Sequence, residues 1–322
     1  MILCVTLNPC LDKTLTVPPW RPGDSVRGTA AREVVGGKGN NVARALSRLD
    51  RKARPVTFLG GPTGHHCETL LRREDGLDPL VVRTISETRV ILTVRTEGTN
   101  EQSAFFDPDP AVTENEAEEM FRGVEAALGE GTVKALTLSG SSPSTATHGL
   151  YSDLISLANA RNLPVFLDTY GPPLDAIWGF WPQSIQLNRR EIATHLRKPA
   201  PAVTDRDVLS LLARWAGHGV SRAVVTDGPN PALARLDGVE YRVIPPSIEA
   251  VNPIGSGDCL MAGLADGWLS GLSGEALIRH AFGCALANAL VWDAGAIDPA
   301  VARIQGESVT IETIAEPNSP TK

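Results

Sequence analysis

The 322-residue sequence has few cysteines, few aromatic residues and no excess of positive charge. Its five cysteines are scattered and form no CxxC pair, which argues against a disulfide framework and against a zinc site. The net charge of −7 argues against a nucleic-acid partner, because binding to nucleic acid needs a dominant basic face. No apolar run approaches the ~20 residues that a membrane span requires, so we expect a soluble, cytoplasmic protein with no membrane partner.

The composition is that of a large α/β domain. Apolar residues make up 42% and charged residues 21% of the chain, close to the averages of soluble globular proteins. From residue 114 onward, predicted helices over 114–128, 148–159 and 208–216 alternate with predicted strands over 135–138, 164–167, 184–187 and 223–226. This alternation predicts a parallel sheet with right-handed crossovers. No shift in composition marks a linker, so we expect one domain over 1–315 and a disordered tail over 316–322.

Polar residues follow the apolar strands where the strands end. Ligands of open parallel sheets gather at the carboxyl ends of the strands, so these residues are candidate ligand contacts. The predicted edge carries Asn8, Asp12, Ser139, Asp168, Asn188, Glu191, Thr226 and Gly228. Asn8 and Asp12 have an alternative interpretation as turn residues, because Asn-Pro pairs commonly start turns.

Some predicted short strands do not belong to the alternation of strands and helices that predicts the parallel sheet. The first group covers 15–17 and 25–35, and the second, which we expect to be antiparallel, covers 81–84, 89–94 and 103–106. Arg89 begins one of these strands. It is a candidate contact for an anionic substrate and, with equal weight, a solvated strand residue.

A glycine-rich turn, Gly255-Ser256-Gly257-Asp258, leads into a predicted helix over 259–270. A helix N-terminus offers unpaired N–H groups and a partial positive charge, and glycines let a ligand approach the backbone, so the turn is a good anion site. Asp258 in that position could act as a base toward a hydroxyl group. The alternative is that Asp258 is only the N-cap of the helix.

A second glycine-rich turn, Gly36-Gly37-Lys38-Gly39-Asn40-Asn41, opens an amphipathic helix that we expect from residue 42. Its spacing differs from that of a Walker A loop and from that of the dinucleotide fingerprint. Lys38 is suited to an anion and Asn41 to sugar hydroxyls. The alternative is a glycine turn with exposed polar residues.

Five motifs in this order resemble the ribokinase-like superfamily, specifically its phosphofructokinase B branch of carbohydrate kinases. The motifs are Thr6-Leu7-Asn8-Pro9-Cys10-Leu11-Asp12-Lys13-Thr14, Gly36-Gly37-Lys38-Gly39-Asn40-Asn41-Val42-Ala43, Leu167-Asp168-Thr169-Tyr170-Gly171, Asn188 with Glu191, and Asn252-Pro253-Ile254-Gly255-Ser256-Gly257-Asp258. The first two look most like 1-phosphofructokinase and tagatose-6-phosphate kinase, which act on a phosphorylated ketohexose. The resemblance implies a Rossmann-like, mainly parallel sheet flanked by helices, a small β-sheet lid at about 9–35 and 86–107, and a homodimer formed through the lid.

The resemblance also implies an ATP- and Mg²⁺-dependent transfer of a γ-phosphoryl group to a sugar phosphate. Asp258 would be the catalytic base, and the N–H groups of Gly255, Ser256 and Gly257 would stabilise the transferring group. Substrate contacts would come from Asp12, Gly37, Lys38, Asn41, Arg89 and Ser139, with Lys38 and Arg89 on the substrate's own phosphate. The nucleotide would contact Asn188, Thr226, Gly228, Gly257 and Asn288, while Glu191, through water, and Asn188 would organise Mg²⁺.

Three stretches depart from the family pattern and leave the preferred phosphate donor open. They are Tyr170 with the prolines at 172 and 173, the pair Gln186-Leu187 before Asn188, and the turn Asp227-Gly228-Pro229-Asn230. Two alternatives therefore stand beside a sugar-phosphate kinase. One is a kinase of a free sugar or nucleoside, and the other is a catalytically idle protein that binds a sugar phosphate.

Overall fold

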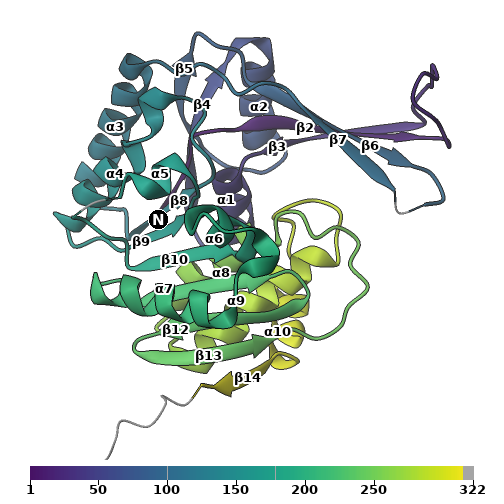
Figure 1. Ribbon diagram of the computed structural model, residues 1–322. Coiled ribbons are helices and arrows are strands. Elements are labelled where there is room, and N and C mark those ends of the chain that lie inside the picture. The colour runs from purple at the N-terminus through teal and green to yellow at the C-terminus, as the bar shows by residue number, and fades with distance from the viewer. Residues whose placement is uncertain (100, 178, 315–322) are drawn as a thin grey trace, which may run out of the picture.

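The computed structural model of the chain describes residues 1–99, 101–177 and 179–314. Its centre is a ten-stranded sheet with the strand order β14-β13-β12-β11-β10-β9-β8-β1-β4-β5 (Figure 1). The strands are β1 (Ile2–Thr6), β4 (Ala53–Gly60), β5 (Leu80–Thr84), β8 (Ala135–Ser139), β9 (Val165–Asp168), β10 (Ser184–Asn188), β11 (Arg222–Asp227), β12 (Asn230–Leu236), β13 (Val239–Ile244) and β14 (Thr310–Thr313). The seven strands from β5 to β11 pair in parallel, and β12, β13 and β14 extend the sheet in antiparallel pairs.

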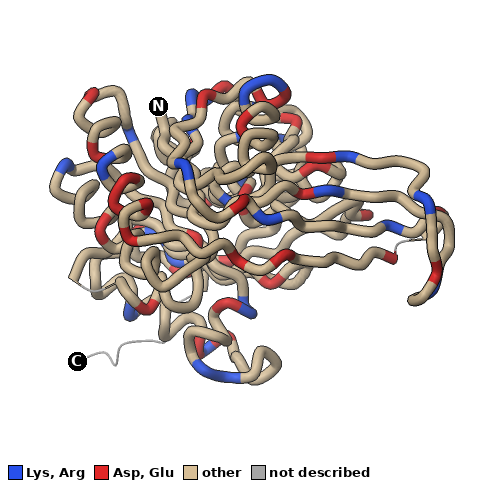
Figure 2. Tube along the Cα trace, turned by 90° about the horizontal axis from the view of Figure 1, so that it is seen from above, with Lys and Arg blue, Asp and Glu red and all other residues tan. Residues whose placement is uncertain are grey.

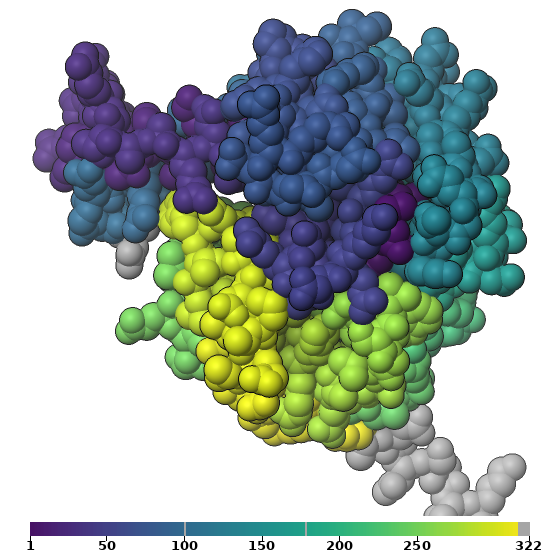
Figure 3. Space-filling model, turned by 180° about the vertical axis from the view of Figure 1, so that it is seen from behind, coloured from purple at the N-terminus to yellow at the C-terminus, as the bar shows by residue number. Residues whose placement is uncertain are grey.

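Helices cover both faces of this sheet, which explains why its central strands are apolar throughout. All five residues of β1 are buried, and Leu3 and Val5 pack into one hydrophobic cluster while Ile2 and Cys4 pack into another. The first cluster includes residues of α3 (Glu114–Gly129), α4 (Leu150–Asn159) and α7 (Asp205–Gly217), near which α5 (Pro172–Asp175) and α6 (Arg189–His195) lie. The second includes residues of α1 (Lys38–Arg48), α2 (Gly61–Arg73), α8 (Ser256–Leu269), α9 (Gly274–Ala289) and α10 (Pro299–Glu307). Figure 3 shows residues of the N-terminal part of the chain, in purple and blue, beside residues of the C-terminal part, in green and yellow, on one face of the molecule.

A separate four-stranded sheet, called the lid sheet below, projects from the body of the molecule (Figure 1). It has the order β3-β2-β6-β7 and consists of β2 (Cys10–Val17), β3 (Ala30–Gly36), β6 (Arg89–Thr96) and β7 (Gln102–Phe106). Its outer pairs are antiparallel, whereas β2 and β6 pair in parallel along their whole length. The α/β architecture expected from the sequence, with a mainly parallel sheet and a small second sheet, is confirmed.

The structure corrects our prediction of a second antiparallel group that includes residues 81–84. These residues form β5, which pairs in parallel with β4 at the edge of the main sheet, and β6 pairs in parallel with β2. The reason is topological. β2 follows β1 and β6 follows β5, and because β1 and β5 run in the same direction in the main sheet, both lid strands leave it in the same direction.

Several elements differ from the sequence prediction near their ends. The helix expected from residue 42 begins at Lys38, and the turn at 227–230 joins β11 to β12, a strand we did not expect. The chain after Ile304, which reads as polar tail, continues α10 and then adds β14 to β13. The tail predicted over 316–322 lies outside the described residues. Within the described ranges, none of the helices has the length and apolarity needed to cross a membrane.

Candidate active site

A cavity of about 1210 Å³ lies between the carboxyl edge of the main sheet, the lid sheet and the loop before α8. It opens beside β1 and β8, where the chain order reverses, because the chain leaves β1 toward β4 and β5 and returns at β8. Such reversal points are where open α/β sheets bind ligands. The volume exceeds the usual range of a single small-molecule pocket, so the cavity has room for two ligands at once.

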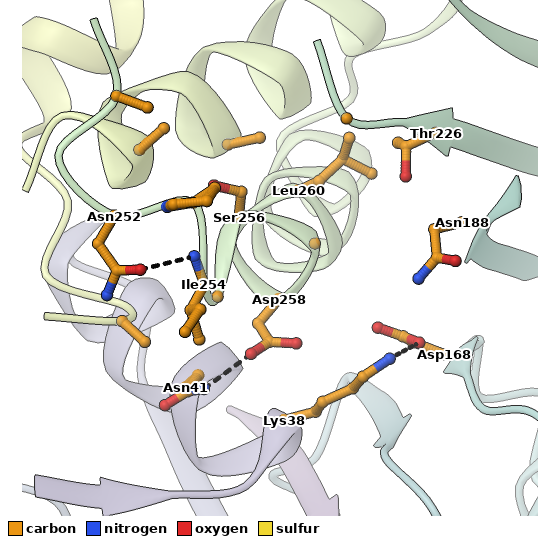
Figure 4. A pocket seen from close by; sticks show the side chains of 18 of the residues that line it. Lys38, Asn41, Asp168, Asn188, Thr226, Asn252, Ile254, Ser256, Asp258 and Leu260 are labelled. Atoms are coloured by element: carbon orange, nitrogen blue, oxygen red, sulfur yellow. Dashed lines mark hydrogen bonds and ion pairs between the residues drawn. The ribbon is translucent and has the colours of Figure 1, made fainter. Parts of the chain in front are cut away.

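Asp258 reaches this cavity from the first turn of α8 (Figure 4). Gly255 precedes the helix with φ +84, and a Cβ atom there would lie 2.6 Å from that of Ala294, so only glycine fits without strain. Asn252 braces the turn, since its Oδ1 accepts from the Ile254 N–H at 3.1 Å and its Nδ2 donates to the Trp292 carbonyl at 2.8 Å.

The interpretation of Asp258 as an N-cap is wrong. Gly255 occupies the cap position, and no side chain makes a cap hydrogen bond at this end of α8. Asp258 is instead 5% exposed, and its Oδ2 accepts a 2.7 Å hydrogen bond from Nδ2 of Asn41. Within the described chain the N–H groups of Gly255, Gly257 and Asp258 find no protein acceptor, whereas that of Ser256 donates to the Pro253 carbonyl at 3.2 Å. Three unpaired donors therefore stand beside one buried carboxylate.

Lys38 and Asn41 come from the first turn of α1, which packs closely on β1. At Gly39 a Cβ atom would lie 2.5 Å from the carbonyl oxygen of Val5, so the absence of a side chain sets how near the helix comes. The Nζ of Lys38 lies 2.7 Å from Oδ1 of Asp168 and 2.9 Å from Oε1 of Glu191. One cation thus joins the exit of β9 to the first turn of α6.

The charges of this cluster shift one another's protonation. Burial raises the pKa of Asp258 to about 7, and the positive charge of Lys38 opposes that rise. Burial likewise raises the pKa of Asp168 to about 6, again opposed by Lys38. Burial alone would lower the pKa of Lys38, but Asp168 and Glu191 raise it well above its usual value. Lys38 therefore stays protonated, while Asp258 exchanges its proton near neutral pH.

Arg89 lines the same cavity in a separate set of contacts. Its Nη1 is 3.0 Å from Oδ1 of Asp109, and its Nη2 donates a long, 3.4 Å bond to the Asn8 carbonyl. Oδ1 of Asp109 also accepts from Nδ2 of Asn8 at 2.8 Å, and that amide donates to Ser141 Oγ at 3.1 Å. Lys38 and Arg89 line the same cavity but contact different carboxylates. No signal in the sequence pointed to Asp109, whose Asp-Pro-Asp-Pro setting looks like a turn.

Most of the other predicted site residues lie together around the cavity. Asn188 and Glu191 form a reciprocal cap at α6, with Asn188 Oδ1 accepting from the Glu191 N–H at 3.0 Å and Glu191 Oε2 from the Asn188 N–H at 2.9 Å. The cavity is lined by Asp12, Gly37, Lys38, Asn41, Arg89, Asn188, Glu191, Thr226, Gly228, Gly255, Ser256, Gly257 and Asp258. Burial, followed by the charge of Asp293, raises the pKa of Asp12.

Two predicted residues do not reach the cavity. Ser139 is fully buried at the end of β8 and does not line it. Asn288 is also fully buried, in α9, where its Nδ2 donates to the Ile254 carbonyl at 2.9 Å and its Oδ1 accepts from the Gly295 N–H at 2.9 Å. Asn288 therefore supports the turn before Asp258 from behind.

The sequence profile of the pfkB family of carbohydrate kinases matches residues 5–303. The chain belongs to this family. Membership implies ATP as co-substrate and typically Mg²⁺, and it agrees with the ribokinase-like arrangement of a large sheet and a small one.

Solved structures of the same fold match nearly the whole chain. Phosphofructokinase-2 from Escherichia coli, in complex with potassium, is 25% identical with a TM-score of 0.85, over 96% of this chain and 98% of that one. A protein from Thermotoga maritima described as a possible 1-phosphofructokinase is 23% identical with a TM-score of 0.86, over 98% and 100%. A carbohydrate kinase from Agrobacterium tumefaciens is 20% identical with a TM-score of 0.74, over 97% and 99%.

The donor set of the site suits Mg²⁺ held mainly through water. Within the described ranges, no three His, Cys, Asp or Glu side chains gather closely enough to hold a metal by themselves. Both oxygens of Glu191 already accept hydrogen bonds, from Lys38 and from the Asn188 N–H. Mg²⁺ keeps several waters and usually takes one or two carboxylates together with substrate phosphates. Glu191 and Asp168, both beside the cavity, fit that role without forming a closed protein cage.

Proposed function

We propose that the protein transfers the γ-phosphoryl group of ATP to a hydroxyl of a ketohexose phosphate, of the fructose 1-phosphate or tagatose 6-phosphate type. One observation carries the proposal: a buried carboxylate with a pKa near neutrality, Asp258, stands beside three backbone N–H groups that have no acceptor among the residues the structure describes. A base poised near the working pH and donors aimed at developing negative charge are the two groups that phosphoryl transfer needs from a protein.

Asp258 accepts the proton of the attacking hydroxyl in this mechanism. The proton goes to the carboxylate as the oxygen–phosphorus bond forms, and ADP leaves with the electrons of the broken bond. Asn41 donates to Oδ2 of Asp258 and thereby fixes the orientation of the carboxylate. The N–H groups of Gly255, Gly257 and Asp258 stabilise the oxygens of the transferring group, and Ser256, whose N–H is engaged, contributes the structure of the turn.

Lys38 takes a different role from the one predicted from the sequence. Its contacts with Asp168 and Glu191 favour a position beside the base over a position on the acceptor's own phosphate. There its charge stabilises the ionised form of Asp258. Mg²⁺, when bound near Glu191, Asp168 and the nucleotide phosphates, would neutralise phosphate charge. Thr226 and Gly228, at the end of β11, line the end of the cavity that we assign to the nucleotide.

Arg89 is the residue that we assign to the acceptor's phosphate, with Asp12 and Asn41 on sugar hydroxyls. Arg89 is 15% exposed, and its Nε is buried with no hydrogen-bond partner in the described chain. A guanidinium with an unused donor is well suited to a phosphoryl group, which accepts several hydrogen bonds. Phosphofructokinase-2 from Escherichia coli, 25% identical to this chain, has been solved in complex with fructose-6-phosphate, which supports a phosphorylated acceptor here.

We also propose a homodimer formed through the lid sheet. All five residues of β7 are exposed, including Phe105 at 53% and Phe106 at 64%. Figures 1 and 2 show the sheet extending away from the body, so that the described chain leaves it largely uncovered. Two neighbouring exposed phenylalanines on an edge strand are a feature that a second copy of the chain would cover.

The decisive experiment compares acceptors. Purified protein with ATP and Mg²⁺ is assayed against fructose 1-phosphate, tagatose 6-phosphate, fructose and ribose, and we expect turnover of a phosphorylated sugar. Arg89→Ala should raise the KM for that sugar by roughly 10- to 100-fold, from the loss of charge-assisted hydrogen bonds, and leave the KM for ATP unchanged. Arg122→Ala, on the exposed face of α3, is the matched control. Equal turnover of free and phosphorylated sugars would contradict the proposal.

A second candidate is a kinase of an unphosphorylated sugar. The contact between Arg89 and Asp109 favours it, because the cation already has an anionic partner within the chain. Under this alternative, Arg89→Ala changes no acceptor's KM selectively.

A further inference from the structure

The cation that we assign to the acceptor's phosphate is already neutralised. Oδ1 of Asp109 lies 3.0 Å from Nη1 of Arg89 and accepts a 2.8 Å bond from Nδ2 of Asn8. A single carboxylate oxygen thus occupies the point where an arginine and an amide donor converge. An anionic group that binds Arg89 from the cavity, which Arg89 and Asn8 line, must compete with this oxygen for Nη1 or use the donors that it leaves free.

The backbone holds Asp109 in this position. Pro108 and Pro110 flank it, and a residue before proline is restricted to extended conformations. The segment is also anchored to β6, because the Asp107 N–H donates to the Val90 carbonyl at 3.0 Å and Asp107 Oδ2 accepts from the Val90 N–H at 2.9 Å. The carboxylate of Asp109 therefore starts from a narrow set of positions beside Arg89.

The two partners differ in how easily they can leave the contact. The side chain of Arg89 is 15% exposed, whereas that of Asp109 is 48% exposed. Asp109 can turn into water and regain its hydration, while Arg89 stays in place with its buried Nε still lacking a partner. A phosphoryl group carries up to two negative charges and three acceptor oxygens, so it can use donors that one carboxylate oxygen leaves unfilled.

We propose that Asp109 is an internal competitor of the acceptor's phosphoryl group, an anion that stands at Arg89 and Asn8 and weakens the binding of any anion that must take its place. The inference rests on the proposed function, since it concerns the acceptor side of the same site. The free energy lost when the contact between Arg89 and Asp109 breaks is the same for every ligand, so the anion with the strongest attraction to Arg89 overcomes it best. The second ionisation of a phosphate ester has a pKa of about 6, so at neutral pH the acceptor's phosphoryl group is mostly a dianion.

The test uses inorganic phosphate as the probe and needs no turnover. Phosphate binding to the whole protein is measured by titration calorimetry at pH 5 and pH 8, in wild type and in Asp109→Asn, which keeps the shape of the side chain and removes its charge. We expect Asp109→Asn to tighten phosphate binding by roughly three- to tenfold, the range of a partly exposed ion pair, and to do so by a similar factor at both pH values. Glu114 is exposed and makes no hydrogen bond or ion pair to Arg89, so Glu114→Gln should leave the phosphate Kd unchanged at both pH values.

Kinetics and a second background separate the possible failures. The KM for the sugar phosphate should fall with the phosphate Kd in Asp109→Asn, and the effect should vanish when Arg89→Ala is also present. Unchanged or weaker phosphate binding in Asp109→Asn would overturn the role of Asp109, even if a sugar phosphate is the substrate. Wild-type turnover restricted to free sugars would instead overturn the proposed function, and with it the displacement of Asp109 by an acceptor.

Discussion

Replacing Asp258 with Asn is expected to stabilise the folded protein above neutral pH while removing its activity. Burial raises the pKa of Asp258 from 3.8 to about 7, so between these values the folded state holds a proton that the unfolded state has released. Stability then falls as the pH rises through this window. The difference between the two pKa values corresponds to at most ~4 kcal/mol of lost stability above pH 7.

Asparagine at this position avoids the loss. It remains uncharged at every pH, and its amide oxygen can still accept the hydrogen bond from Asn41. Below about pH 4 the two proteins should be equally stable, and above pH 7 the variant should gain up to ~4 kcal/mol. Asp168, with a pKa raised by burial to about 6, titrates in the same window, and its charge raises the pKa of Asp258, so the difference between the two proteins includes the repulsion between these carboxylates.

The assay is urea unfolding followed by tryptophan fluorescence at pH 5, 6, 7 and 8.5, with kinase turnover measured in parallel. Loss of the base should lower kcat by about two to four orders of magnitude, and ATP should still stabilise the variant against unfolding. Glu114→Gln, a change at an exposed position of α3, is the control variant in both measurements. A difference between Asp258→Asn and wild type that is flat from pH 5 to 8.5 would refute the reasoning, as would turnover within tenfold of wild type.

Three further predictions follow from contacts described above. Lys38→Met removes the charge that lowers the pKa of Asp258 and Asp168, so the midpoint of the pH dependence of kcat/KM should move up by about one pH unit or more. Lys38→Arg keeps the charge and serves as the control. An unmoved midpoint in Lys38→Met would contradict the role assigned to Lys38. Gly255→Ala places a methyl group on a residue with φ +84 and against Ala294, so the free energy of unfolding should fall by about 1–3 kcal/mol and kcat should fall as well. Gly217→Ala, whose added Cβ meets no atom within 4 Å, should be neutral in thermal unfolding. Phe106→Asp places a charge on the exposed edge of the lid sheet and should shift the protein toward monomer in sedimentation velocity, while a monomeric wild type would remove the basis for a lid dimer.

The sequence was informative where the signal is local. Gly255 and Gly37 mark the two helix N-termini because each adopts a positive φ, of 84 and 104, next to a periodic apolar segment. The alternation of strand and helix after residue 114 predicted the parallel sheet, since each crossover is a short-range pattern. These features fix the position of Asp258 and the helix that presents Asn41.

The features that the sequence did not show depend on contacts between residues that lie far apart in the chain. Lys38 contacts Asp168 and Glu191, which follow it by 130 and 153 residues, and the glycine-rich sequence around it does not indicate which carboxylates it contacts. β5 was placed in the wrong sheet because a short apolar strand carries no information on its neighbour. Asp109 looked like part of a turn, and only the position of Asn8, 101 residues earlier, gives it a contact in the site.

The parallel pairing of β2 with β6 has a consequence for how the protein acquires its site during folding. Cys10 lies beside Arg89 and Val17 beside Thr96, so every residue of this pair joins positions 79 apart in the chain. Closing so long a loop is entropically costly and slow unless intervening structure brings the ends together. We therefore expect β1, β4 and β5 to assemble before the lid sheet forms.

The two halves of the site are then expected to form at different times during folding. The half that we assign to the acceptor, with Asp12 on β2 and Arg89 on β6, depends on that long-range pairing. The half that we assign to the nucleotide depends on β10, β11 and the neighbouring end of α8, which belong to the main sheet and its covering helices. Amide hydrogens of the lid sheet should accordingly exchange through small openings that leave the main sheet intact. As denaturant is added, the protein is expected to lose binding of the sugar before it loses binding of the nucleotide.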